Sequence, residues 1–507
     1  MNVRNKLISL SFILIFGFSM LSGMALSVSY ATVDETNAQA EDRIRDLREY
    51  LIKNGLKPEG RPLIANGHDD SGKVALYREL SAFSIENSIG IAALSKDFQA
   101  TGNVESDNWA QADMWRVLNN MAAFQESAFG VLRHENSDKD EFYTIDYFMF
   151  LEFIGESKVL TGSSEMYLKL NELFIRRSRF YSNSTQYGVD GLGSWLTAIK
   201  SGAQFIPPGP NTQDYQYSLT NHSLWAAAGF SSFSLAVRGT KDDAVDQYSK
   251  LALQEAEESI GFADAYTFNR LFGLYHEDKV RTNTSLYSFS ANTQIVAILA
   301  CARLSQATGK EIYIKKADAI INALMSNFWD TGRGGLYSSM NPLTGQISGV
   351  KLGYDNALFA YALLQLAKVR DLEEFTPEYF IRGKGQNEYF NLAKDVMNYL
   401  YNYHWGISSS FRGYYEWVDR DGQYAGPNDL ANTTRLTTTN MLALYNLANI
   451  IWASRPFMVV YQMYFIVGGG ILAVIIMVIV IVVRRSRQGT SLSKITKGLL
   501  ASSDKED

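Results

Sequence analysis

The sequence predicts an all-α fold in which six helical hairpins close into a ring, with long loops at one end. Two observations lead to this prediction. Six long apolar helices are expected, each beginning near a small polar or acidic residue, and six amphipathic, charged helices alternate with them. The connections that lead into the apolar helices are long, whereas most of those that leave them are short. We therefore expect an inner ring of apolar helices within an outer ring that faces water.

The expected inner helices share a similar beginning. The residues that follow each start would make a helix that is apolar on most sides, as in Ala357-Leu358-Phe359-Ala360. Such a helix is typically buried within a domain. The six starts are Ile85-Glu86-Asn87, Thr144-Ile145-Asp146, Leu219-Thr220-Asn221, Ser290-Ala291-Asn292, Tyr354-Asp355-Asn356 and Thr438-Thr439-Asn440.

The expected outer helices carry more charge. They cover approximately residues 40–54, 108–126, 164–181, 241–260, 311–328 and 387–403. In the fourth of them, Ala244, Tyr248, Leu251 and Ala252 recur at helical spacing among charged positions, which predicts one face toward the domain and one toward water. The first outer helix is expected to close the ring against the last inner helix, which begins at Thr437.

The long loops all lead into inner helices, so they are expected together at one end of the ring. They span about 15 to 40 residues, well beyond ordinary loop lengths, and long structured loops in a compact domain are usually functional. We call this end the mouth, and we expect a functional site there.

The two ends of the chain have the composition of export and anchoring segments. Residues 1–31 resemble a secretory signal, with Arg4 and Lys6 before an apolar core and Ser29-Tyr30-Ala31 as the cleavage site; cleavage near Ala25 is the alternative. Residues 456–483 form an uncharged apolar run, long enough for a transmembrane helix, and arginines follow it at once. We expect a single-pass protein of the cell membrane, with an exterior domain at 32–455 and a cytoplasmic basic and polar tail at 484–507.

Composition narrows the class of partner and cofactor. The formal net charge is −6, which argues against a nucleic-acid partner. Cys301 is the only cysteine, so the chain can form no internal disulfide and no cysteine-rich metal site. No two histidines have the spacing of metal ligands, and no phosphate-binding or dinucleotide-binding glycine motif occurs. We expect neither a metal nor a cofactor.

One long phrase resembles a known superfamily. It runs Phe328-Trp329-Asp330, then Gly334-Gly335-Leu336-Tyr337, Gly345, Lys351 and Tyr354-Asp355-Asn356-Ala357. The chain resembles the six-hairpin (α/α) barrel superfamily, and is similar to the N-acylglucosamine 2-epimerase and cellobiose 2-epimerase group and to six-hairpin glycoside hydrolases. The resemblance implies an (α/α)6 barrel over nearly the whole exterior domain and a carbohydrate as ligand.

Hydrolysis of a glycoside needs two carboxyl groups, one to donate a proton and one to activate water or attack. Asp355 opens an inner helix within the phrase above, and Glu86 has a similar place in the first inner helix. Glu416 lies among the aromatic rings of Tyr414, Tyr415 and Trp417, which could stack on a sugar. The alternative for Asp355, Glu86 and the asparagines at helix starts is helix capping. The alternative for Glu416 is a surface ribbon.

Histidines and aromatic residues supply the remaining candidates. His222, in the first turn of an inner helix, and His404, in a long loop, are candidate acid–base groups; the alternative for each is a hydrogen-bonded structural histidine. The expected substrate-binding residues are Tyr337, Tyr354, Tyr415, Trp417 and Asn356.

The sequence therefore predicts a membrane-anchored, extracytoplasmic carbohydrate-active protein of the glycoside hydrolase kind. Two alternatives stay open. One is a sugar epimerase or isomerase that uses His222 or His404, and the other is a non-catalytic glycan-binding surface receptor.

Overall fold

The computed structural model of the chain describes fourteen stretches, all within the unit formed by Asp34–Phe375 and Gly385–Ser454. They are residues 35–51, 67–68, 84–108, 110, 141–156, 181–182, 194–195, 198–200, 220–238, 243–277, 288–373, 387–407, 412–423 and 435–454. The expected signal at 1–31, the apolar run at 456–483 and the tail at 484–507 lie outside these stretches. Within them, no helix has both the length and the apolar character needed to span a bilayer.

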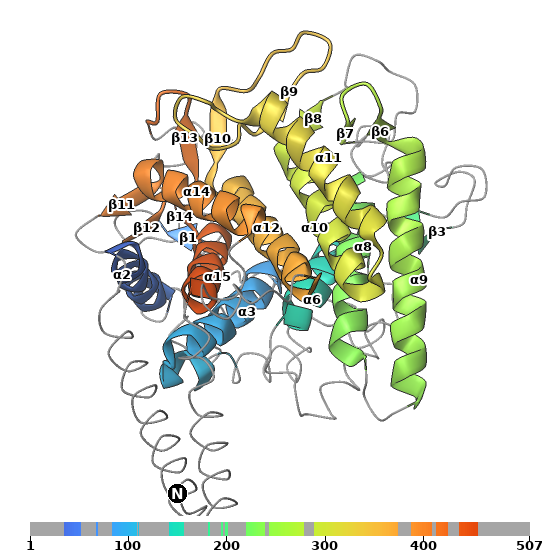
Figure 1. Cartoon of the computed structure of the whole chain (residues 1–507), viewed down its shortest axis with the longest axis horizontal. Helices are drawn as coiled ribbons and strands as arrows, with labels where there is room; N and C mark the ends of the chain where they lie inside the picture. Colours follow the sequence, from blue (N-terminus) through green and yellow to red (C-terminus); the bar gives the residue numbers. More distant parts are fainter. Residues whose placement is uncertain are drawn as a thin grey trace, which may run out of the picture. The chain divides into compact units, whose positions relative to one another are not determined.

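All six predicted inner helices are present. They are α3 (Ser84–Thr101), α6 (Thr144–Glu156), α8 (Thr220–Val237), α10 (Ala291–Thr308), α12 (Gly353–Glu373) and α15 (Thr437–Ser454). Each packs against the next along the chain, and α15 packs against α3 (Figure 1). The six helices therefore form a closed ring, as the sequence predicts.

Four of the predicted outer helices lie within the described residues. They are α2 (Glu35–Tyr50), α9 (Asp243–Tyr266), α11 (Glu311–Phe328) and α14 (Glu388–Tyr403). Helices α9, α11 and α14 pack on the inner helices that precede them, α8, α10 and α12. The outer helices expected at 108–126 and 164–181 lie outside the described residues except at their edges, where Asn108 and Ala110 are helical and Tyr181 belongs to a strand.

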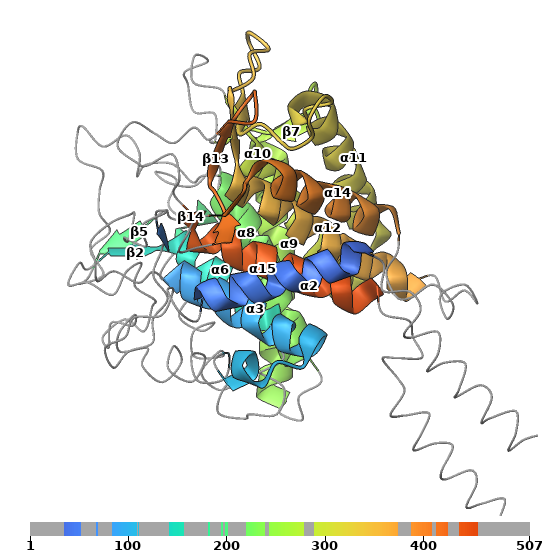
Figure 2. The ribbon, with the colours of Figure 1, turned by 90° about the vertical axis from the view of Figure 1, so that its left-hand side faces the viewer.

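Helix α2 closes the outer layer against the last inner helix, as predicted. It lies along α15 (Figure 2). Its Arg48 donates from Nε and Nη2 to the buried Asp97 of α3, at 2.6 and 2.7 Å. A two-bond pair between a guanidinium and a carboxylate fixes orientation as well as distance. The first element of the domain is thereby joined to both helices at the point of closure.

Short antiparallel strands join the long loops. The strands are β1 (Gly67–His68), β2 (Glu141–Tyr143), β3 (Tyr181–Ser182), β4 (Ser194–Trp195), β5 (Ala198–Lys200), β6 (Phe268–Asn269), β7 (Leu274–Tyr275), β8 (Phe289–Ser290), β9 (Ser339–Met340), β10 (Val350–Leu352), β11 (Trp405–Ile407), β12 (Arg412–Tyr414), β13 (Trp417–Asp419) and β14 (Arg435–Leu436). The pairs are β1–β14, β2–β5, β3–β4, β6–β7, β8–β9, β10–β13 and β11–β12. Pairs such as β8–β9 and β10–β13 join the loops of successive hairpins, so the mouth is bounded by connected backbone.

Amide side chains in the first turn of three inner helices hold the loops in place. Each amide oxygen accepts from the backbone N–H of a loop residue at 2.8 Å, and each amide nitrogen donates to the carbonyl of the same residue. The pairs are Gln294 with Tyr275, Asn356 with Leu336, and Asn440 with Tyr414. Helix capping was therefore the wrong interpretation for Asn356 and Asn440, because their oxygens accept from the preceding loop rather than from their own helix.

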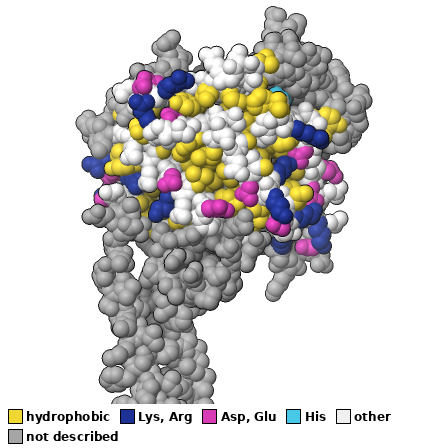
Figure 3. Space-filling model, turned by 45° about the horizontal axis from the view of Figure 1, so that its top comes forward, with side chains coloured by type: hydrophobic (Ala, Val, Ile, Leu, Met, Phe, Trp, Pro, Cys, Tyr) yellow, Lys and Arg dark blue, Asp and Glu magenta, His cyan; other side chains and the backbone are white. Residues whose placement is uncertain are grey.

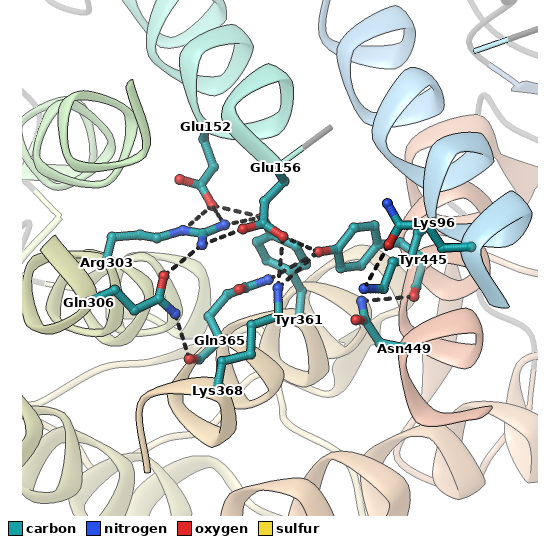
Figure 4. Close-up of polar contacts among 11 residues, drawn as sticks. Lys96, Glu152, Glu156, Arg303, Gln306, Tyr361, Gln365, Lys368, Tyr445 and Asn449 are labelled. Atoms are coloured by element: carbon teal, nitrogen blue, oxygen red, sulfur yellow. Dashed lines mark hydrogen bonds and ion pairs between the residues drawn. The ribbon is translucent and has the colours of Figure 1, made fainter. Parts of the chain in front are cut away.

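Side chains cross the interior of the ring below the mouth (Figure 4). Helices α6 and α12 are not neighbours in the ring, yet the rings of Phe153 and Tyr361 have centroids 5.3 Å apart. Glu152 of α6 accepts from Arg303 of α10 at 2.6 Å and from the Tyr361 hydroxyl at 2.7 Å. Glu152 and Tyr361 each lie eight residues after the first residue of their helix, which is a depth of about 12 Å. A ligand that enters at the mouth therefore has to bind above these side chains.

The charges of this interior network balance. Arg303 pairs with Glu152 and Glu156, and Lys368 pairs with Glu156 at 2.8 Å. Burial acts to raise the pKa of Glu156, but Arg303 and Lys368 hold it well below its usual range. The Tyr445 hydroxyl of α15 also donates to Glu156. Two cations and two anions from α6, α10 and α12 are thus tied together, with α15 attached, which fixes the spacing of four inner helices.

Candidate active site

The rim of the mouth is built from one backbone contact that occurs three times. A loop carbonyl accepts from the N–H of the first residue of the preceding inner helix. The donors and acceptors are Thr220 with Glu277, Ala291 with Ser338, and Gly353 with Glu416, at 2.9, 2.9 and 2.7 Å. In each loop, the residue two positions before the acceptor is hydrogen-bonded to the side-chain amide of the inner helix that follows the loop. Positions 277, 338 and 416 are therefore equivalent rim positions.

Glu416 occupies the last of these rim positions and is buried. Its Oε1 accepts from the backbone N–H of Tyr354 at 3.2 Å, and its Oε2 accepts from the Thr439 hydroxyl. The side chain is only 2% exposed, so the alternative of a surface ribbon was wrong for Glu416. The backbone also approaches closely here, because a Cβ on Gly353 would lie 2.8 Å from the Tyr415 carbonyl oxygen.

Asp355 lies in the first turn of α12, directly after Tyr354, whose backbone N–H donates to Glu416. Its Oδ1 accepts from Asn292 Nδ2 at 2.9 Å, and Asn292 Oδ1 accepts from Asn221 Nδ2 at 3.0 Å. A line of hydrogen bonds thus runs along the starts of α8, α10 and α12. Asp355 is 3% exposed, and its hydrogen bond reaches a neighbouring helix rather than its own backbone.

The two carboxyl groups have pKa values on opposite sides of neutrality. Burial raises the pKa of Glu416 to about 8, and the charge of Asp355 adds to the increase. Burial raises the pKa of Asp355 to about 6, and the charge of Glu277 adds to it. Near pH 7, Glu416 therefore carries a proton while most Asp355 is ionised. Carboxyl pairs whose environments separate their pKa values in this way can divide the roles of acid and base.

The two candidate histidines differ in their surroundings. His404 is fully buried, with Nδ1 2.8 Å from the Tyr415 carbonyl oxygen and Nε2 3.0 Å from the Tyr399 hydroxyl. Burial lowers its pKa to about 4, so it is a neutral ring with both nitrogens bonded, as the structural alternative predicts. Burial also lowers the pKa of His222 to about 4, but its Nδ1 has no hydrogen-bond partner in the described structure.

The aromatic candidates divide between the loop framework and the rim. Tyr337 is buried, donates to Asp330 at 3.1 Å and lies under the ammonium group of Lys351. Tyr415 is buried beside Glu416, whereas Tyr354 and Trp417 are half-buried. Trp417 pairs with Leu352 in the β10–β13 ribbon. Tyr354 and Trp417 are therefore the more accessible of the expected sugar-binding rings.

Two further sequence candidates have less defined roles at the site. Asn356 is fully buried, and both of its amide atoms bond to backbone. Glu86 lies in the first turn of α3, and its side chain is outside the described part of the chain. The sequence interpretation did not recognise Asn292 or Thr439 as partners of the carboxyl pair, although both lie in the quoted helix starts.

The described surface shows both signs of charge. On the face in Figure 3, a band of hydrophobic side chains is surrounded by basic and acidic ones. Asp355 and Glu416 are buried and contribute little to this surface. The local environment of the pair, rather than a general surface charge, therefore sets its chemistry.

No protein-family model and no curated protein sequence matches the chain. Solved structures do match over most of its length. A D-mannose isomerase has a TM-score of 0.59 and 14% identity, with 83% of this chain and 99% of that chain covered. A cellobiose 2-epimerase from Spirochaeta thermophila has a TM-score of 0.57 and 13% identity, over 83% and 98% of the two chains.

A glycosidase is also among the similar structures. It is an inactive variant of an α-1,6-mannanase of Salegentibacter sp., with two aspartates replaced by asparagine, in complex with α-1,6-mannotriose. Its TM-score is 0.52 at 14% identity, over 81% of this chain and 99% of that chain. The chain therefore has the six-hairpin (α/α)6 barrel fold, and the fold that the sequence resemblance implied is confirmed.

Proposed function

We propose that this protein is a membrane-anchored, extracytoplasmic carbohydrate-active enzyme of the glycoside hydrolase kind. The observation that carries the proposal is the pair Asp355 and Glu416, which meets at the mouth of an (α/α)6 barrel with separated pKa values. One group is protonated and the other mostly ionised near pH 7, and this is the combination that glycoside hydrolysis needs.

The chemical step follows from these protonation states. Glu416 gives its proton to the glycosidic oxygen as the bond between that oxygen and the anomeric carbon breaks. Asp355 either takes a proton from the water that attacks the anomeric carbon, or attacks that carbon itself before water releases the sugar. In both routes one water is consumed. When Asp355 acts as the base, it releases the proton it took from water to the solvent and Glu416 regains a proton from the solvent; when Asp355 attacks, Glu416 regains its proton from the water that releases the sugar. The anomeric form of the first product distinguishes the two routes.

The fold neighbours suggest sugars for a first test. An α-1,6-mannanase, a cellobiose 2-epimerase and a D-mannose isomerase share the fold, so α-1,6-mannotriose, cellobiose and D-mannose form a compact panel. The purified full-length chain is incubated with each sugar, and the products are followed by proton NMR. Hydrolysis yields shorter sugars, whereas isomerisation or epimerisation yields a new sugar of the same mass.

Two variants connect the activity to the carboxyl pair. Asp355→Asn and Glu416→Gln preserve size while removing the ionisable group, and each is expected to lower kcat by about a hundredfold or more. Ser338→Ala, at the equivalent rim position without a carboxyl group, is the matched control. Conversion that survives both carboxyl replacements would exclude this pair as the acid and base.

A sugar epimerase or isomerase is the second candidate, and His222 favours it. This histidine is neutral, buried in the first turn of α8, and its Nδ1 has no hydrogen-bond partner in the described structure. A neutral imidazole nitrogen can accept a proton from a carbon next to a carbonyl group. A product of unchanged mass that is lost in His222→Gln would favour this candidate. Binding of a sugar without any conversion would instead support a glycan-binding receptor.

The membrane location rests on the two ends of the sequence. The proposed signal at 1–31 and the proposed helix at 456–483, followed by basic residues, predict an exterior domain and a cytoplasmic tail. Protease added to intact cells should remove the domain and leave the tail. A domain that becomes digestible only after lysis would contradict the proposed orientation.

A further inference from the structure

Glu277 occupies the rim position equivalent to that of Glu416, two hairpins earlier. Its carbonyl accepts from the N–H of Thr220 at 2.9 Å, as that of Glu416 accepts from Gly353 at 2.7 Å. Two residues before Glu277, the backbone of Tyr275 is held by Gln294. The same backbone arrangement therefore brings a second glutamate to the rim of the mouth. At the position between the two, the chain has Ser338, which carries no charge.

Glu277 differs from Asp355 and Glu416 in its exposure. It is half-buried, whereas the other two carboxyl groups are almost fully buried. The Ser288 hydroxyl donates to its Oε2 at 2.7 Å and fixes one side of the carboxylate. The negative charge of Glu277 also raises the pKa of Asp355, in addition to the increase caused by burial. Glu277 thus acts electrostatically on Asp355 and is the more accessible acid.

The start of α8, next to Glu277, has polar atoms that lack partners. Within the described residues, Thr220 Oγ1 and Asn221 Oδ1 accept no hydrogen bond, and Thr220 is fully buried. At the starts of α10 and α12 the residues equivalent to Thr220 are Ala291 and Gly353, whereas α6 and α15 also begin with a buried threonine, Thr144 and Thr437. Among these three threonines, Thr220 is the one whose Oγ1 has no partner in the described structure. A buried polar atom without a partner is costly, and such atoms in native proteins usually bond to water or to a ligand.

Asn221 connects this group to the carboxyl pair. Its Nδ2 donates to Asn292, and Asn292 donates to Asp355. The chain thus has, beside the proposed acid and base, one accessible carboxylate, one amide oxygen and one hydroxyl. Carboxylates and amides are suited to the hydroxyl groups of a neutral sugar, because a carboxylate accepts strong hydrogen bonds and an amide oxygen has two acceptor sites.

We propose that Glu277, Asn221 and Thr220 form a subsite that binds the hydroxyl groups of a pyranose ring next to the Asp355–Glu416 pair. Glu277 accepts from sugar hydroxyls and so determines which sugar is placed against the two carboxyl groups. The inference rests on the proposed function, since it names the substrate-binding part of that same site. Its ligand is a neutral sugar rather than an anionic one, because a second negative charge beside Glu277 and Asp355 would be repelled.

The test uses the full-length chain, the panel of α-1,6-mannotriose, cellobiose and D-mannose, and three variants. Glu277→Gln removes the charge and keeps the shape, and it is expected to raise KM, or the Kd of a bound sugar, about tenfold or more. It should also move the acidic limb of the pH profile to lower pH, because the charge of Glu277 contributes to the raised pKa of Asp355. Glu277→Asp keeps the charge, so the acidic limb should stay at the wild-type pH. Its shorter side chain should weaken sugar binding in part.

Ser338→Ala is the matched control, because residue 338 has the same backbone position but no carboxyl group. It should leave KM and the pH limb unchanged, and equal melting temperatures for all variants would exclude misfolding as the cause. An unchanged KM and an unmoved limb in Glu277→Gln, or equal effects in Ser338→Ala, would overturn the subsite. If the wild-type chain binds a sugar, binding weakens in Glu277→Gln, and no sugar is converted, the subsite is supported and the proposed hydrolase function is contradicted. A wild-type chain that binds none of the three overturns both proposals.

Discussion

The buried carboxyl of Glu416 predicts an unusual dependence of stability on pH, which can be measured without knowing the substrate. Its pKa rises from 4.5 to about 8 on folding. At about 1.4 kcal/mol for each pKa unit, ionising this group within the fold costs about 5 kcal/mol more than ionising it in the unfolded chain. The unfolded chain releases the proton near pH 4.5, whereas the folded chain retains it until about pH 8. Stability from this group is therefore present below pH 4.5 and lost as the pH rises toward 8.

Replacing Glu416 by glutamine should remove this loss. The free energy of unfolding is measured by denaturant titration at pH 4.5 and at pH 8. Between these two pH values it should decrease more in wild type than in Glu416→Gln, by about 5 kcal/mol as an order-of-magnitude value. Asp355→Asn is the comparison, with a smaller difference of about 3 kcal/mol confined to the window between pH 3.8 and about 6. Wild type and Glu416→Gln with parallel stability profiles would refute the inference that Glu416 is buried with a raised pKa.

Two further predictions concern the framework of the barrel. Gly335 has φ of +78°, and a Cβ there would lie 2.3 Å from the Tyr399 ring, whereas Gly345 has φ of +67° and nothing within 4 Å. Gly335→Ala should therefore lower the free energy of unfolding by about 1–3 kcal/mol more than Gly345→Ala, and equal losses in denaturant titration would argue against the close contact. Arg303→Met leaves the buried Glu152 without a cation and removes one of the two cations paired with Glu156, so it should cost about 3–5 kcal/mol. A loss below about 1 kcal/mol would mean that the interior network does not hold the helices together.

Local pattern was sufficient to predict most of the helical framework. The apolar run after Asp355 is buried on all sides in α12, and the charged sequence at 311–328 forms α11 with the predicted bounds. Helix α2 begins earlier than predicted, at Glu35 rather than near residue 40, and the predicted residues 52–54 lie outside the described part of the chain. Its contacts with α15 and α3 are contacts that no local pattern contains. Helix periodicity is local, whereas the exact ends of a helix depend on its neighbours.

The candidate site was predictable only in part. Asp355 and Glu416 were chosen separately for their local surroundings, and the structure brings them together because β10 and β13 pair. The roles of asparagine were mistaken, since Asn440 holds a loop residue that lies 26 positions earlier in the chain. Arg303 gave no signal in an apolar helix, because its partner Glu152 is 151 positions away. Contacts over such separations depend on the closure of the ring, which a single sequence does not specify residue by residue.

The most direct test of the central claim is the pH dependence of kcat/KM for the sugar that the chain converts. The account requires Asp355 ionised and Glu416 protonated, so activity should rise through a pKa near 6, peak near pH 7 and fall through a pKa near 8. Asp355→Asn should abolish the acidic limb together with most of the activity. A profile that lacks either limb, or keeps both in the two single carboxyl variants, would contradict the assignment of this pair as base and acid.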